Sequence, residues 1–182
     1  MRIMGGKYKG KAIRLPKEIR PTQGLVRKAL FDILGDIEGL SFLELFAGSG
    51  AVGFEAVSRG VAGLTLVEYN RNCLMAIRKN IESLKPKACD LYPKEAGDAI
   101  EAFHKDKRKF DIIFLDPPYH NKGMSKKILQ MLGAYDILAP NGFVVVQHFK
   151  KEQLSKESGK LTLIKESRYG DTLLSFFKKK EY

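Results

Sequence analysis

The chain is poor in the residues that hold exported or metal-binding proteins together. It has 182 residues with only two cysteines, Cys73 and Cys89, and three histidines, and none of these shows the spacing of a metal site. Two cysteines make no disulfide framework, so we expect both to be reduced packing residues. The first residues lack the apolar core of a signal peptide, and no run of about 18 apolar residues occurs. These absences predict a soluble, cytoplasmic protein without a metal and without a membrane partner.

Acidic residues are outnumbered by basic ones. The chain has 32 Lys plus Arg against 21 Asp plus Glu, a formal net charge of +11. Such an excess favours a polyanionic partner, nucleic acid first, although a merely solubilising surface remains open. The length and the hydrophobic content of 44% fit a single α/β domain with a sizeable core. We expect a monomer.

Glycines gather where one apolar run breaks. The sequence FLELFAGSGAVG, residues 42–53, predicts a buried strand, a tight turn and a helix. Gly48, Gly50 and Gly53 fit the G-x-G-x-x-G spacing, which lets the backbone approach a ligand. A second apolar run ends in Glu68, 18 positions after Gly50 (68 minus 50), where a carboxylate commonly binds ribose hydroxyls. The alternative is a plain turn followed by a solvated acid.

Glu44 indicates which cofactor such a loop would bind. Its carboxylate stands at the end of the first strand, just before the glycines. The pyrophosphate of a dinucleotide about 4 Å away would be repelled by roughly 4 kcal/mol at an effective dielectric near 20, whereas an ammonium and a sulfonium would be attracted. Glu44 therefore favours S-adenosylmethionine, unless it is a partly exposed acid with a basic partner of its own.

A third strand is expected over residues 88–96, and Asp98 follows it. At this position the fold places a group that recognises a bound adenine, but Asp98 could equally be the N-cap of a helix over 99–104. The cofactor site is therefore predicted to consist of Glu44, Phe46, Ala47, Gly48, Gly50, Glu68, Tyr69, Asp98 and Ala99.

The most informative residues are Asp116-Pro117-Pro118-Tyr119, which follow the apolar run 110–115. Prolines cannot extend a central strand, and they stiffen the edge of the sheet where open α/β folds bind ligands. Asp116 and the carbonyl of Pro117 could accept both hydrogens of an exocyclic amino group while Tyr119 stacks on its base. Two fixed acceptors would disperse the positive charge that develops on such a nitrogen during methyl transfer. Asp116, Pro117 and Tyr119 are the predicted catalytic residues; the alternative is a strand-ending turn without chemistry.

Basic residues gather near the start of the chain. Residues 1–19 predict a small β-hairpin, and Tyr8 among lysines gives the mixture that stacks on bases and pairs with phosphates, although a solvated tail remains open. Arg20 and Arg27 flank the start of the helix that follows. The candidate RNA-binding residues are Arg2, Lys7, Tyr8, Lys9, Lys11, Arg20 and Arg27.

Helices are further expected over 70–84 and 128–138, a fifth strand over 143–149, and a hairpin whose strands, 161–168 and 172–178, flank Tyr169-Gly170-Asp171.

These motifs resemble class I S-adenosylmethionine-dependent methyltransferases that carry the (Asp/Asn)-Pro-Pro-(Tyr/Phe) sequence of amino-group methylation. Within this class, nearly the whole chain resembles the RsmD-type small-subunit rRNA (guanine-N2)-methyltransferases. The segments that carry this resemblance are RIMGGKYKGKAI, RPT followed by VRKALFDIL, FLELFAGSGAVGFEAVSRG, LVEYN, DIIFLDPPY and YGDTLLSFF. Glu44 stands where many members carry Asp.

The resemblance implies a Rossmann-like fold: a mostly parallel seven-stranded sheet with a C-terminal antiparallel hairpin and helices on both faces. The N-terminal β-hairpin, residues 1–19, would precede a methyltransferase domain of residues 20–182. The implied activity is methyl transfer from S-adenosylmethionine to a guanine N2 of 16S ribosomal RNA within an assembling small subunit.

Three other functions remain open. An adenine-N6 DNA methyltransferase would use the same four residues, although 182 residues leave little room for a target-recognition domain. A dinucleotide-dependent oxidoreductase fits the glycine spacing but has no need of the Asp-Pro-Pro-Tyr turn. A non-catalytic RNA-binding assembly module fits the charge but leaves Glu44, Glu68 and Asp116 without a purpose.

Overall fold

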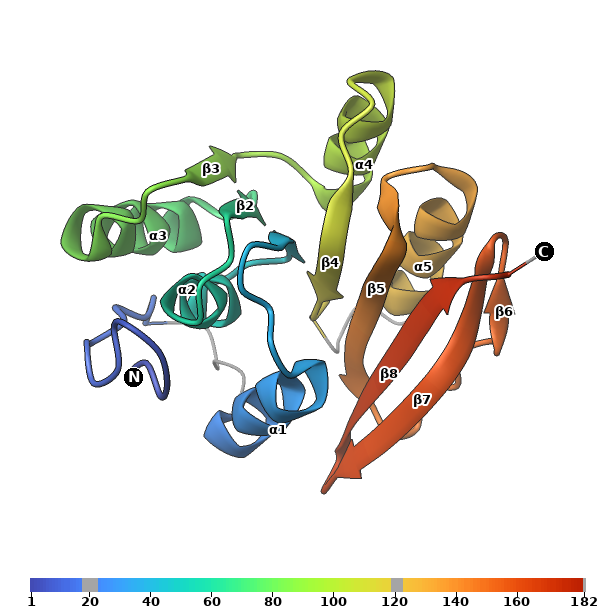
Figure 1. Cartoon of the computed structure of the whole chain (residues 1–182), viewed down its shortest axis with the longest axis horizontal. Helices are drawn as coiled ribbons and strands as arrows, with labels where there is room; N and C mark the ends of the chain where they lie inside the picture. Colours follow the sequence, from blue (N-terminus) through green and yellow to red (C-terminus); the bar gives the residue numbers. More distant parts are fainter. Residues whose placement is uncertain (18–22, 119–122, 182) are drawn as a thin grey trace.

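The fold is known from a computed structural model, which describes residues 1–17, 23–118 and 123–181. Its centre is an eight-stranded sheet in the order β3-β2-β1-β4-β5-β8-β7-β6 (Figure 1). The strands are β1 Ser41–Leu45, β2 Gly63–Val67, β3 Cys89–Tyr92, β4 Phe110–Leu115, β5 Leu138–Phe149, β6 Glu157–Ser158, β7 Leu161–Tyr169 and β8 Thr172–Lys179. The helices are α1 Gly24–Leu34, α2 Ala51–Ser58, α3 Arg71–Leu84, α4 Ala96–Lys105 and α5 Met124–Ala134.

The sheet is mixed. Strands β3, β2, β1, β4 and β5 run parallel to one another, whereas β8, β7 and β6 join by antiparallel pairing. The α/β fold and the C-terminal hairpin agree with the sequence-based prediction, but the expected count of seven strands is wrong. The additional strand, β6, pairs with β7 over two residues only, which is too short to leave a periodic signal in the sequence.

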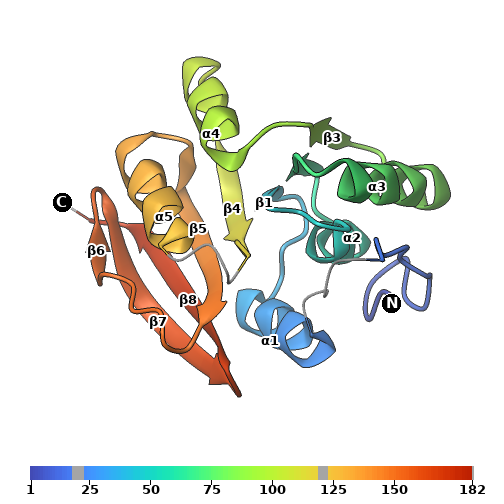
Figure 2. The ribbon, with the colours of Figure 1, turned by 180° about the vertical axis from the view of Figure 1, so that it is seen from behind.

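Helices cover both faces of the sheet, because the parallel strands are apolar on both sides (Figures 1 and 2). One face packs against α1, α2 and α3, with Phe42 of β1 and Phe114 of β4 in that cluster. The opposite face packs against α4 and α5, with Leu43 and Leu45 of β1 in the second cluster. This alternation within β1 leaves Glu44 on the side of α2.

The N-terminal segment is a closed loop packed on the domain. Instead of the expected two-stranded hairpin, a single antiparallel bridge joins Arg2 and Ala12. Ile3 and Ile13 are each 3% exposed and belong to the core cluster beneath α1, α2 and α3. The segment is thus not a free tail, while a domain boundary at residue 19 stays a prediction because residues 18–22 lie outside the described part.

Several element boundaries differ from those expected. Helix α3 begins one residue after the predicted start because Asn70 is its N-cap, accepting hydrogen bonds from the backbone N–H groups of Asn72 and Cys73. Helix α5 ends at Ala134, and β5 already begins at Leu138, five residues before the expected Phe143. The register of β5 on β4 shifts between Phe110 and Ile112, so Asn141-Gly142 lies inside an irregular strand and does not end an element.

Gly53 allows α2 to approach the sheet. A Cβ atom at this position would lie 2.7 Å from Cδ1 of Leu64 and 2.8 Å from Oε2 of Glu44. Both distances are shorter than van der Waals contact, and the neighbours are buried. The third glycine of the motif is therefore required for packing of the helix on β1 and β2.

We predict that Gly53→Ala lowers the free energy of unfolding by about 1–3 kcal/mol, because the added methyl group overpacks this region. Gly63→Ala is the matched control, since a Cβ atom there meets no atom within 4 Å, and its effect should stay within about 0.5 kcal/mol. Urea unfolding of both variants measures the difference. Equal stabilities would contradict the packing role of Gly53.

Candidate active site

Three carboxylates lie at the carboxyl ends of adjacent parallel strands. Glu44 is in β1, and Leu45 after it pairs with Val67 of β2 on one side and Leu115 of β4 on the other. Glu68 and Asp116 directly follow those two partners. The sheet order reverses at β1, so this acidic cluster lies at the topological switch point where open α/β sheets bind ligands.

The glycine loop between β1 and α2 has a strained backbone at Phe46. Phe46, Gly48 and Gly50 all have positive φ, at 60°, 57° and 73°. Phe46 is costly in this conformation, by about 1 kcal/mol or more, and the hydrogen bond of 3.0 Å from Ala47 N–H to the Val67 carbonyl holds the loop in place. Such strain is typical of backbone that is shaped to hold a ligand.

Glu68 connects the glycine loop to the start of α3. Its Oε2 accepts a hydrogen bond of 2.8 Å from Gly48 N–H, and its Oε1 accepts bonds of 2.8 Å from Tyr69 N–H and Asn70 N–H. Glu68 is 7% exposed, so it is not a solvated strand end, whereas the adjacent Tyr69 is 58% exposed. The loop thus presents a fixed carboxylate beside an exposed aromatic ring.

Glu44 is buried, at 3% exposure, and its Oε2 accepts a hydrogen bond of 2.8 Å from Gly53 N–H. Burial, and then the nearby charges of Asp116 and Glu68, raise the pKa of Glu44 to about 8, although the Gly53 hydrogen bond opposes the shift. Glu44 makes no ion pair within the described residues, so it is not an exposed acid with its own basic partner. A cationic ligand would be stabilised beside this cluster, and a pyrophosphate would be repelled.

Asp116 lies just beyond β4 and is held from the next strand. Nε2 of Gln147 in β5 donates a hydrogen bond of 2.8 Å to Oδ2 of Asp116, and Pro117 beside it is buried. Gln147 was not among the residues expected from the sequence; the available signal was a polar residue directly after the apolar run 143–146, on the same face as Val145. Tyr119, the third expected catalytic residue, lies outside the described residues.

Asp98 and Ala99 lie in the first turns of α4. The helix begins at Ala96, and its N-cap is Glu95, so the interpretation of Asp98 as an N-cap is wrong. Asp98 is exposed and Ala99 is fully buried. An exposed carboxylate in the helix that follows β3 is available to a ligand at the carboxyl edge of the sheet.

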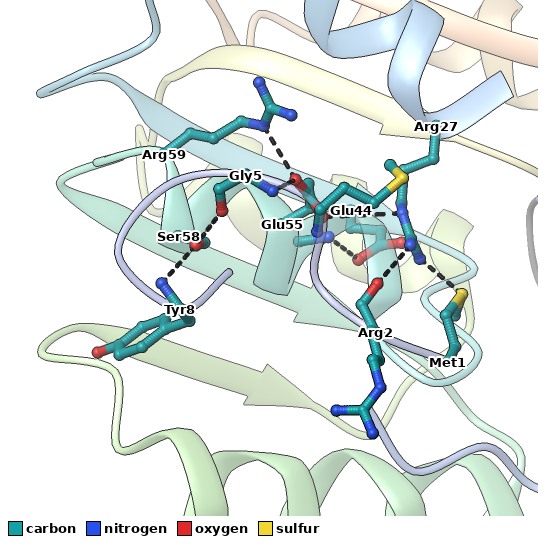
Figure 3. A network of polar contacts seen from close by, with 11 residues as sticks. Met1, Arg2, Gly5, Tyr8, Arg27, Glu44, Glu55, Ser58 and Arg59 are labelled. Carbon is teal, nitrogen blue, oxygen red and sulfur yellow. Dashed lines mark hydrogen bonds and ion pairs between the residues drawn. The ribbon is translucent and has the colours of Figure 1, made fainter. Parts of the chain in front are cut away.

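Glu55 of α2 forms a buried network that the sequence did not predict (Figure 3). Its carboxylate accepts hydrogen bonds of 2.9 Å from Met4 N–H and Gly5 N–H, and one of 3.1 Å from Nε of Arg59. Arg27, at 2% exposure, lies with its Nε 3.8 Å from Glu55 Oε2 and donates a hydrogen bond of 2.7 Å to the Arg2 carbonyl. Because a fully buried carboxylate requires cationic partners, Arg27 points inward, and the expectation that it contacts RNA is wrong.

Other basic residues do reach the surface. Lys7, Lys9 and Lys11 are exposed around the half-buried Tyr8, with Nζ of Lys7 and of Lys11 at 5.6 Å and 4.9 Å from the centre of its ring. Arg2 is exposed and donates a hydrogen bond of 2.6 Å to the Gly10 carbonyl. Arg20 lies outside the described residues.

A groove with further basic residues lies beside α3. It has a volume of about 550 Å³ and runs between the N-terminal segment and α3, with Arg14, Lys17 and Lys79 beside Leu15, Pro16, Asn72, Met75 and Ala76. Nearby, Asn80 donates hydrogen bonds to the carbonyls of Arg14 and Ser49, at 3.1 Å and 3.0 Å. The N-terminal segment and the glycine loop are therefore both hydrogen-bonded to the side chain of Asn80 in α3.

The sequence model of the family described as "Conserved hypothetical protein 95" matches residues 1–178. The chain belongs to this family of RsmD-type methyltransferases. The expected resemblance is thereby confirmed, and the chain is an enzyme, a methyltransferase. The oxidoreductase and the non-catalytic module are set aside.

Relatives of this family member match along most of the chain. "Putative rRNA methyltransferase YlbH" of Bacillus subtilis is 32% identical, over 99% of this chain and 100% of its own length. "Ribosomal RNA small subunit methyltransferase D" of Buchnera aphidicola is 34% identical, over 84% of this chain and 80% of its own. The solved structure "Putative methyltransferase yhhF from Escherichia coli" superposes with a TM-score of 0.84 at 28% identity, covering 98% and 97% of the two chains.

Two negative findings apply to the described ranges alone. No cluster of three or more His, Cys, Asp or Glu side chains there has an arrangement that could hold a metal ion. No described helix is long and apolar enough to cross a membrane.

The raised pKa of Glu44 gives a prediction about stability. Between the ordinary value of 4.5 and about 8, the folded protein keeps a proton on Glu44 that the unfolded chain has released. The free energy of unfolding should therefore fall as pH rises through this window, by up to about 1.4 kcal/mol per pH unit, and level off above it.

Glu44→Gln keeps an acceptor for Gly53 N–H but cannot titrate, so its free energy of unfolding should lack this decrease with pH. Urea unfolding of both proteins from about pH 5 to pH 9 tests it, and the stability of the wild type relative to the variant should decrease with pH. A difference that is flat, or that grows with pH, would contradict a proton on buried Glu44.

Proposed function

We propose that the enzyme transfers a methyl group from S-adenosylmethionine to the exocyclic N2 of a guanine in small-subunit (16S) ribosomal RNA. The observation that carries the proposal is the position of Asp116-Pro117 at the end of β4, one strand from Glu44 and beside the glycine loop. Relatives named ribosomal RNA small subunit methyltransferase D support the substrate class.

The site fits this cofactor by charge and shape. A carboxylate offers about four acceptor positions, and Glu68 uses three of them for backbone N–H groups, which leaves capacity for a ribose hydroxyl. Tyr69 and Asp98 are exposed on the same edge of the sheet and would take the adenine, with Ala99 beneath. When bound, the cofactor supplies an electrophilic methyl group on a cationic sulfur. Asp116 favours that positive charge, and Glu44 does so once the nearby cation has lowered its raised pKa.

Asp116 and Pro117 would act on the target amino group. The carboxylate and the carbonyl accept its two hydrogens and favour a pyramidal nitrogen, whose lone pair is then available to form the new N–C bond. They also disperse the positive charge that develops on that nitrogen. Asp116 then lies where it can accept the proton that the methylated nitrogen releases. Tyr119 is proposed to stack on the base.

The RNA would approach along the basic surface of the N-terminal loop. Lys7, Lys9 and Lys11 are exposed there, and Arg14, Lys17 and Lys79 line the groove between the N-terminal segment and α3. Phosphate contacts of this kind position a substrate without reading its sequence. We further propose that the substrate lies within an assembling small subunit in the cytoplasm. The enzyme would act as a monomer.

The proposal is tested by incubating the purified protein and labelled S-adenosylmethionine with small-subunit particles, and separately with naked ribosomal RNA, from a strain that lacks the protein. Nucleoside analysis should find N2-methylguanosine. A methyl group on a ring nitrogen, on a ribose oxygen or on adenine N6 would overturn the assignment, and the last result would favour the adenine-N6 alternative.

We predict that Asp116→Ala reduces the single-turnover rate by about 10² to 10³, because the variant lacks one preorganised hydrogen bond to the transition state. The dissociation constant for S-adenosylmethionine should change by no more than a few-fold. Asp106→Ala is the control, since this exposed carboxylate at the end of α4 lies on the amino side of β4. Normal turnover by Asp116→Ala would rule out the amino-group mechanism.

Replacing Lys7, Lys9 and Lys11 together by alanine should weaken RNA binding and leave cofactor binding unchanged. The slope of log affinity against log salt should become shallower by slightly less than about one for each phosphate that the variant no longer binds. Affinity measured at several salt concentrations tests this.

The matched control replaces three exposed lysines that precede strands β3, β4 and β7, namely Lys87, Lys105 and Lys160. These strands share one direction, so the control lysines belong to the amino-terminal edge of the sheet, away from the edge with Glu44, Glu68 and Asp116. A salt slope that is equal in both triple variants would show that the N-terminal lysines are only solvated.

A further inference from the structure

Gln147 is a buried amide next to the proposed catalytic acid. It lies in β5 at 4% exposure, after three fully buried valines, and Nε2 donates the 2.8 Å hydrogen bond to Oδ2 of Asp116. Burying an amide in an apolar strand is unfavourable unless its polar atoms find partners. Its nitrogen has one.

The oxygen of the Gln147 amide has no hydrogen-bond partner within the described part of the chain. Oε1 of Gln147 is buried and accepts no hydrogen bond there. Exchanging the positions of Nε2 and Oε1 would be unfavourable. An ionised carboxylate only accepts hydrogen bonds, so the nitrogen must face Asp116. Oε1 is bonded to the same carbon as Nε2, about 2.2 Å from it, so it lies within about 5 Å of Asp116 Oδ2. An acceptor without a donor is thus fixed beside the group that holds the target.

We infer that Gln147 is the residue that selects guanine, its Oε1 accepting the N1–H of the target base while Nε2 holds Asp116. The inference rests on the proposed function, since it deepens the recognition of the same amino group. In guanine, the carbon that bears the N2 amino group is flanked by N1–H, a donor, and by N3, an acceptor. An acceptor adjacent to the amino-binding carboxylate therefore matches the guanine edge.

Adenine does not match this arrangement. Its N6 amino group is next to an unprotonated N1, whose lone pair would face Oε1 of Gln147. A site built around a hydrogen bond discriminates strongly against an analogue that lacks it, because the polar group of the site is then left unpaired. The direction of one amide thus distinguishes the guanine-N2 reaction from an adenine-N6 reaction at the same Asp-Pro-Pro turn.

The test uses 2-aminopurine, which keeps the exocyclic amino group of guanine but has no hydrogen on N1. The methylated position is first mapped by mass spectrometry of RNA fragments, and RNA carrying a single guanine or a single 2-aminopurine there is prepared by ligation. For the wild type, kcat/KM should be about 10²-fold higher with guanine. The readout is this ratio, which a merely structural role of Gln147 would not change.

Gln147→Met, which is close in volume and has no donor and only a weakly accepting sulfur, should act more slowly on guanine because it lacks the hydrogen bond to Asp116. Its guanine to 2-aminopurine ratio should fall below about 10. Gln130→Met on the exposed side of α5 is the control and should keep the wild-type ratio. Binding of S-adenosylmethionine to each variant verifies that the site is folded.

A wild-type ratio near one, or an unchanged ratio in Gln147→Met, would overturn the inference. The wild-type ratio alone decides the case if Gln147→Met does not fold. Failure of the proposed function is a separate outcome, since the wild type would then form no N2-methylguanosine in the unmodified RNA.

Discussion

The backbone N–H of Gly53 donates a hydrogen bond of 2.8 Å to Glu44, and this bond joins the first strand of the sheet to the helix that follows the glycine loop. It requires Gly53, because any Cβ atom there would meet the same carboxylate. It also holds Glu44 in a buried position next to Glu68 and Asp116; the burial, followed by these two charges, raises the pKa of Glu44, and the bond itself lowers it. The position of α2 on the sheet and the place of Glu44 in the acidic cluster both depend on it.

Helix α2 has only eight residues, yet it positions two different parts of the molecule. Its start follows directly on the glycine loop. On its outer side Glu55 and Ser58 accept hydrogen bonds from the backbone N–H groups of Met4, Gly5 and Tyr8 in the N-terminal loop. The segment that carries the exposed lysines is therefore positioned by the same short helix that positions the glycine loop. One short helix therefore contacts both the glycine loop, at its start, and the loop with the exposed lysines, at Glu55 and Ser58.

Local patterns in the sequence were enough for the centre of the fold. Uninterrupted apolar runs predict strands buried on both faces, and the glycine spacing and the Asp-Pro-Pro turn fall at the ends of such strands, so the meeting of Glu44, Glu68 and Asp116 follows from parallel pairing. The inward direction of Arg27 does not follow in this way, because it depends on Glu55, 28 positions later (55 minus 27). Gln147 likewise donates its hydrogen bond to Asp116, 31 positions earlier. Contacts between residues so far apart in the sequence leave no periodic signal.

The outer edge of the sheet shows how a chain with an open sheet avoids aggregation. Strand β6 pairs only with Leu161 and Thr162, at the start of β7, so the rest of β7 has no strand on its outer side among the described residues. That stretch carries the exposed side chains of Lys165, Glu166 and Arg168. A strand from another molecule that added to this edge would have to bring its own backbone against alternating charges. The charges on this edge therefore disfavour its extension by a strand of another molecule, although Ile164 beside them is also exposed.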